Sequence, residues 1–155
     1  MRIAILCTAL AMMLAAAPAS AENQKQSWGF YKSGQEAILV YGVQESEQIT
    51  LSFICEPKKK TLEIISTVMP AKAVAGRPGK IALSNGSSSL KYAGKTAQGA
   101  NDTGIHFGAP IAIEPRLFDL LGTGKWLRID SLGAREVIPL AGIKGKLAQM
   151  RKACR

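Results

Sequence analysis

The stretch ITLSFIC, residues 49–55, alternates its side chains in a way that decides the fold class. Positions 49, 51, 53 and 55 are apolar, whereas positions 50 and 52 are polar. Side chains on a β-strand point alternately to opposite faces, so this pattern predicts a strand with one face in the core. Cys55 falls on that core face.

Strand-like segments continue on both sides of this stretch. Residues 37–43 and 62–68 are rich in β-branched and aromatic side chains, and Asn85-Gly86 is a strong hairpin-turn dipeptide. Shorter strand candidates are residues 28–31, 81–83, 90–92, 105–113, 126–129 and 137–138. We therefore expect about seven to nine short strands, with loops at residues 71–80 and 93–104.

The C-terminus carries the only long helical pattern. Within residues 140–153 and the cysteine that follows, one helix face collects Ile143, Leu147, Met150 and Cys154. Residues 116–121, after a proline, indicate one further helical turn. These patterns predict a mainly β single domain, either an antiparallel β-sandwich or a partly open barrel, with a C-terminal α-helix packed on it.

Residues 1–21 have the features of an export signal. Arg2 precedes an apolar run over residues 3–17, and Ala19-Ser20-Ala21 is a small-x-small cleavage site. We predict cleavage after Ala21 and a mature domain of residues 22–155 in the bacterial periplasm, with secretion or outer-membrane association as further destinations. A short membrane anchor is the other interpretation, which the short run disfavours. No later stretch is apolar enough for a transmembrane helix.

The cysteines predict one disulfide. Cleavage would remove Cys7 and leave Cys55 and Cys154 in an oxidising compartment. Both lie on predicted core faces, one of the strand and one of the helix. The alternative, a pair of metal-binding thiolates, is disfavoured because the chain has no CxxC pair and one histidine without an obvious partner.

Basic side chains are concentrated in two blocks. The chain has 20 Lys and Arg against 11 Asp and Glu, a net charge of +9. Residues 58–95 hold a large basic excess, and residues 141–155 hold no acid. A disulfide would bring residues 58–60 near the basic end of the helix, and the two blocks could then form one positive face.

Such a face would attract polyanions, for example lipopolysaccharide phosphates or anionic lipids. Nucleic acid is a poor partner, since export separates the protein from it and no aromatic side chains interleave the basic runs. A merely solubilising surface is the alternative. The candidate polyanion-binding residues are Lys58, Lys59, Lys60, Lys72, Arg77, Lys80, Lys144, Arg151 and Lys152.

Catalytic motifs are incomplete throughout the sequence. Asp102-Thr103-Gly104 lacks the flanking residues of an aspartic protease, and Gly122 to Trp126 lacks parts of a phosphate loop. His106 alternates with apolar neighbours and is predicted to project from the polar face of a strand. Trp28 and Trp126 are interpreted as core or rim aromatics. We predict no catalytic residues, no metal site and no cofactor.

The C-terminal segments resemble a known family. A short helix is followed by the strand GKWLRI, the strand end IPLAG and a final helix ending in a cysteine, at residues 117–121, 124–129, 138–142 and 147–154. This order resembles the C-terminal part of the invasion-associated locus B family of small exported alphaproteobacterial proteins. The resemblance implies a periplasmic β-domain with a docked helix and a role at the cell envelope, and it implies no active site.

These observations favour an exported, non-enzymatic binding or accessory protein of the bacterial envelope. It would act on an envelope protein that the sequence does not identify, with exposed strand edges and the aromatic N-terminus as contacts. The alternative function is a polyanion or anionic membrane-surface binder that uses the basic face. An enzyme dependent on His106 is the third hypothesis.

Overall fold

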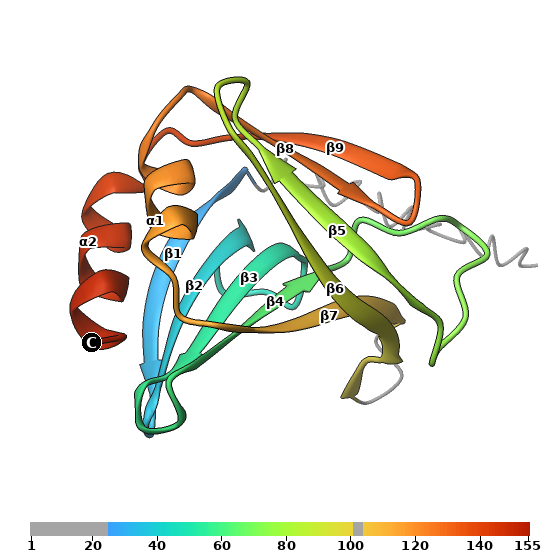
Figure 1. Cartoon of the computed structure of the whole chain (residues 1–155), viewed down its shortest axis with the longest axis horizontal. Helices are drawn as coiled ribbons and strands as arrows, with labels where there is room; N and C mark the ends of the chain where they lie inside the picture. Colours follow the sequence, from blue (N-terminus) through green and yellow to red (C-terminus); the bar gives the residue numbers. More distant parts are fainter. Residues whose placement is uncertain (1–24, 101–103) are drawn as a thin grey trace, which may run out of the picture.

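The chain forms one curled antiparallel sheet. The computed structural model describes residues 25–100 and 104–155. Nine strands lie in the order β1-β2-β3-β4-β7-β6-β5-β8-β9 and bend into a half-barrel (Figure 1). The mainly β prediction is therefore confirmed, and the partly open barrel is the correct one of the two expected architectures.

Nine strands and three helical segments make up the described chain. The strands are β1 (Gln26–Ser33), β2 (Glu36–Val43), β3 (Ile49–Glu56), β4 (Thr61–Ser66), β5 (Pro78–Ser84), β6 (Ser89–Gln98), β7 (Ile105–Ala112), β8 (Trp126–Ser131) and β9 (Ala134–Pro139). The helical segments are the 3-10 turn η1 (Pro57–Lys59) and the α-helices α1 (Pro115–Gly122) and α2 (Lys144–Ala153). The predicted signal segment and its cleavage site lie outside the described residues.

Strand β3 shows how the sequence pattern produces the core. Leu51, Phe53 and Cys55 are at most 1% exposed, as the alternation predicts. Ile49, which the same alternation places inside, is instead 37% exposed. The cause is a bulge, because the register between β2 and β3 shifts between Tyr41 and Gly42.

Two helices cover the open side of the half-barrel. Helix α1 buries Leu117, Phe118, Leu120 and Leu121, while α2 packs against β1 and β2 (Figure 1). The predicted helical face is confirmed, since Ile143, Leu147, Met150 and Cys154 are all buried. The helix begins at Lys144 rather than at residue 140, because a turn with Gly142 at φ +79° precedes it.

A tryptophan joins the two outermost strands. The indole Nε1 of Trp28 in β1 donates a hydrogen bond of 2.7 Å to the carbonyl oxygen of Pro139 at the end of β9. Trp28 itself is 3% exposed and lies 5.3 Å from the ring of Tyr41. The sheet is thus tethered at one point across its gap without closing into a full barrel.

Strand β6 is longer than the sequence indicates. Residues 93–98 are small and polar and are predicted to be loop, but they pair with β5 and β7. Gly94 explains the difference, since a Cβ there would lie 2.1 Å from the carbonyl oxygen of Gly108. The absence of a side chain lets the two strands approach closely, so this glycine marks a packed strand and not a flexible loop.

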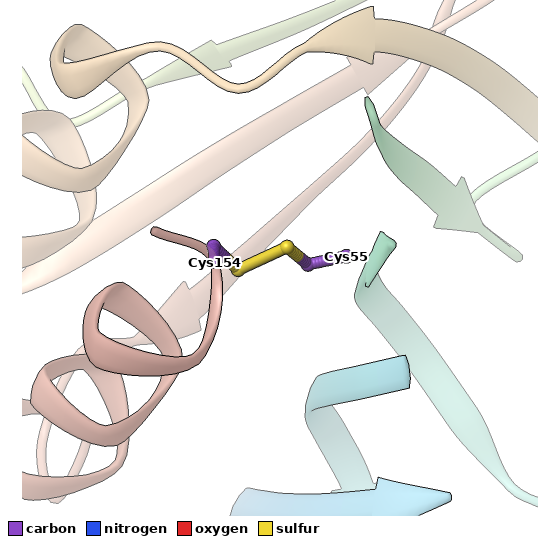
Figure 2. Close-up of a disulfide and its surroundings, with 2 residues drawn as sticks. All are labelled: Cys55 and Cys154. Carbon is purple, nitrogen blue, oxygen red and sulfur yellow. A yellow bond between two sulfur atoms is a disulfide. The ribbon is translucent and has the colours of Figure 1, made fainter. Parts of the chain in front are cut away.

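The predicted disulfide is present between Cys55 in β3 and Cys154 at the end of α2 (Figure 2). The two Cα atoms are 6.0 Å apart, and 99 positions of sequence separate the residues. Because the sulfur atoms bond to each other, they do not serve as thiolate ligands. The disulfide fixes the last helix to a central strand of the sheet.

Removing this disulfide should destabilise the protein by about 4–5 kcal/mol, because it closes a loop of about 100 residues. Urea denaturation of the Cys55→Ala/Cys154→Ala variant measures this change. The reduced wild-type protein is the control, since it keeps the volume of both sulfur atoms. An unchanged free energy of unfolding in both samples would contradict the prediction.

Replacing Gly94 with alanine should lower stability by about 1–3 kcal/mol through overpacking between β6 and β7. A Cβ at this position would also lie 2.9 Å from the Cα of Ala109, so backbone must move to admit it. Gly145→Ala is the matched control, because it adds the same methyl group in α2 with no heavy atom within 4 Å. Equal midpoints for the two variants in thermal unfolding would refute this account.

Candidate binding surface

An exposed aromatic side chain lies on the outer face of the hairpin formed by β8 and β9. Trp126 is 56% exposed, and Val137 on the neighbouring strand is 54% exposed. In the register of the hairpin, Trp126 lies opposite Pro139 and Arg128 lies opposite Val137, so these side chains share one face. The other face holds the buried Leu127, Ile129 and Ile138.

This outer face is flanked by two hollows. One, of about 540 Å³, lies beside Trp126 and is lined by the turn from Gly124 and by the segment from Pro139 to Gly145. The other, of about 280 Å³, lies between Trp126, Val137 and the turn of the hairpin β5–β6. Trp126 lines both hollows, so a ligand in either one would contact it.

The same region is positively charged. Lys125, Arg128 and Lys144 are exposed and make no ion pair with any described residue. Arg135 pairs with Asp130 at 2.7 Å. We call Lys125, Trp126, Arg128, Arg135, Val137 and Lys144 the Trp126 surface.

Neighbouring elements hold this surface in place. The Asn85 side chain donates to the carbonyl oxygens of Leu120 and Thr123, which fixes the β5–β6 turn to the end of α1. Leu140 donates its backbone N–H to the carbonyl of Lys125 at 2.9 Å, just before Trp126. Both ends of the surface are therefore tied to regular structure, so it is presented on a rigid support.

A second region, beside the disulfide, joins part of the two basic blocks. The bond between Cys55 and Cys154 joins the strand that precedes Lys58, Lys59 and Lys60 to the C-terminal end of α2. A pocket of about 230 Å³ lies at this end of the helix, lined by Ile113, Pro115, Phe118, Arg151, Cys154 and Arg155. Ile113 donates its backbone N–H to the carbonyl oxygen of Lys60 at 3.4 Å, so the backbone of residue 60 lies beside this pocket.

Some of these cations already have acidic partners. Lys59 bonds to Glu56 at 2.6 Å, and this hydrogen bond raises the pKa of the Lys59 ammonium group. Arg151 pairs with Asp119 at 2.6 Å and lies 5.5 Å from the ring of Phe118. The positive charge available to a ligand is therefore smaller than the residue count indicates.

The remaining basic candidates lie elsewhere. Lys72 and Arg77 precede β5 and Lys80 lies within it, and Figure 1 shows the start of β5 on the side of the molecule away from the C-terminus. Lys144 is in the first turn of α2, at the opposite end from Arg151 and Lys152. The nine candidates thus form separate patches rather than one face.

His106 lies in a shallow hollow on the outer face of the sheet. The hollow has a volume of about 500 Å³ and also contains Glu63, Lys95 and Pro110. No described residue hydrogen-bonds to the imidazole of His106. Within residues 25–100 and 104–155, no three His, Cys, Asp or Glu side chains lie close enough to hold a metal ion.

The alternation of side chains along one strand could have predicted the exposure of Trp126. In the strand WLRI the buried side chains are Leu127 and Ile129, so Trp126 falls on the same face as Arg128. Side chains two positions apart on a strand share a face, so an apolar residue two positions from a charged one is expected to be exposed with it. Of the two tryptophans interpreted as core or rim aromatics, Trp28 lies in the core and Trp126 is an exposed rim residue.

No protein family, curated protein or solved structure matches this chain. No helix in the described part of the chain is long and apolar enough to cross a membrane. The exposed surfaces of the chain are therefore the features that point to a function.

Proposed function

We propose that this chain is an exported, non-enzymatic binding protein of the bacterial cell envelope that acts through contacts with a protein partner. The observation that carries the proposal is the exposure of Trp126 beside Val137 on the outermost hairpin. Large aromatic side chains are enriched among the residues that dominate protein–protein binding energies. Positively charged rims, as here, add selectivity for acidic partners.

Export is supported by three separate features. The N-terminal sequence has the organisation of a signal peptide. Disulfides such as the one between Cys55 and Cys154 persist in oxidising compartments. The resemblance of residues 117–154 to invasion-associated locus B proteins supports the envelope as the destination.

Substitution of Trp126 by alanine should weaken partner binding about 30-fold or more, the loss expected for an interface residue worth at least 2 kcal/mol. A photo-crosslinking amino acid replaces Arg128 in two proteins, one with Trp126 and one with Trp126→Ala. The measurement compares the protein adducts that the two form in cells. Thermal unfolding should be nearly unchanged, because over half of the Trp126 side chain is already exposed.

A photo-crosslinking residue at Gln149 is the control, since that position is exposed on α2 and away from the hairpin. A protein adduct at position 128 that is absent at position 149 and lost with Trp126→Ala supports the proposal. Equal adducts at both positions, or none, would contradict it.

A second function, binding of an anionic membrane or another polyanion, is favoured by one observation. The disulfide joins the strand just before Lys58, Lys59 and Lys60 to the basic end of α2. Lipopolysaccharide and anionic lipids carry the phosphate groups that such a cluster attracts. Exposed charges act over about 8 Å at physiological ionic strength, so this binding would weaken steeply with salt.

Changing Lys58, Lys59 and Lys60 to glutamate should reduce binding to vesicles of anionic phospholipid several-fold at low salt. The matched control reverses Lys72, Arg77 and Lys80, which changes the net charge equally on a different part of the surface. Sedimentation with vesicles measures both variants. Equal losses would show an effect of net charge alone and would argue against a site beside the disulfide.

A further inference from the structure

Strand β9 is an outer strand of the sheet and leaves backbone groups without partners. It pairs only with β8, through a two-residue turn in which Leu132 and Gly133 have φ of 52° and 90°. Such a turn makes Ser131 and Ala134 a hydrogen-bonded pair. Alternation then directs the N–H and C=O groups of residues 134, 136 and 138 toward β8, and those of residues 135 and 137 outward.

An observed hydrogen bond confirms this phase. Pro139 is in step with residues 135 and 137, and its carbonyl oxygen accepts from Trp28 Nε1 across the gap of the sheet. Among the described residues, no group bonds to the outward N–H and C=O of Arg135 and Val137. At the other outer strand, β1, helix α2 packs against it and against β2. Within the described chain, the edge of β9 is therefore open at Arg135 and Val137.

The side chains beside this edge define what could pair with it. Val137 and Trp126 supply exposed apolar surface, while Arg128, Arg135 and Lys125 supply positive charge. The one acidic side chain on that face, Asp130, is already paired with Arg135. Glu136 is in phase with the inward-facing Ile129, and its charge acts on Tyr41, whose pKa is raised by burial first and by Glu136 second.

We propose that the free edge of β9 accepts an extended acidic segment of a partner protein as an added strand. This inference rests on the proposed function and specifies its mode of binding. Backbone hydrogen bonds to Arg135 and Val137 would provide affinity that does not depend on side chains. Apolar residues of the segment would contact Val137 and Trp126, and its carboxylates would face the surrounding cations.

A second copy of this chain is a poor occupant of the same edge. Pairing two β9 strands would bring Arg135 of one molecule near Arg135 of the other, and Arg128 on the neighbouring strand adds to the positive charge on each side. Like charges on adjacent strands destabilise the pairing. An acidic segment gains from the charges that a second copy would oppose.

The test begins with selection of short linear peptides from a display library on the oxidised mature protein. Peptides that bind should alternate acidic and apolar residues. Their affinities are then measured by fluorescence anisotropy for the wild type, Val137→Pro and Val137→Thr. Proline removes the outward N–H, which has no partner among the described residues, and edge strands tolerate such a proline. Threonine keeps the N–H and the branched side chain, so it is the matched control.

Binding should fall about tenfold or more with Val137→Pro, equivalent to about 1.4 kcal/mol, and should change little with Val137→Thr. Hydrogen exchange should slow at the amides of Arg135 and Val137 when the peptide binds. N-methylation of the peptide backbone gives a second readout that leaves the protein unaltered. Methyl groups at alternate amides should abolish binding in one phase and be tolerated in the other.

Several results would overturn the strand addition. These are failure to select any peptide, equal binding to Val137→Pro, equal effects of both N-methylation phases, and dimerisation of the chain through β9. A protein adduct at position 128 that survives Val137→Pro would overturn the added strand while supporting the proposed function. Absence of any protein adduct at position 128 when both Trp126 and Val137 are intact would contradict both.

Discussion

The covalent bond between Cys55 and Cys154 is the constraint on which the arrangement of the helices depends. Helix α2 has only two fully buried residues within its bounds, Leu147 and Met150. A helix this short and polar gains little stabilising free energy from the burial of its side chains alone. The disulfide attaches its end to β3 in the middle of the first half of the sheet, and α2 therefore stays against β1 and β2 (Figure 2).

The attachment also keeps α2 beside one of the two outer strands of the sheet. A curled antiparallel sheet that does not close must leave two outer strands, and exposed edges invite uncontrolled pairing. Helix α2 packs against β1 and against its neighbour β2, and the hydrogen bond from Trp28 to Pro139 joins the two outer strands at one point. Along the rest of β9, no described group bonds to the outward N–H and C=O of Arg135 and Val137.

Much of the fold could be predicted from local patterns. The alternation of residues 49–55, the Asn85-Gly86 turn and the helical spacing ending at Cys154 each report a local geometry that the structure keeps. The errors arise where distant strands determine the result. Gly94 is strand and not loop because β7 approaches it closely, and Ile49 is exposed because a bulge changes its phase. Neither cause is visible in the neighbouring residues.

The candidate sites were harder to predict for the same reason. The disulfide could be inferred from two cysteines on core faces. The position of Lys72, Arg77 and Lys80 depends on where β5 joins the sheet, which composition does not specify. Trp126 required the phase of one short strand, and the open edge of β9 required the whole strand order.

The cations around β9 have two physical consequences at once. Because Arg135 lies on the edge strand and Arg128 on the strand next to it, two copies of the chain repel each other where their strands would otherwise pair. The same charges lower the energy of an approaching acidic strand and increase its rate of encounter. Solubility of the exposed edge and selectivity for a partner thus come from the same side chains. An uncharged edge of equal length would provide the backbone groups without discriminating between a partner and a second copy.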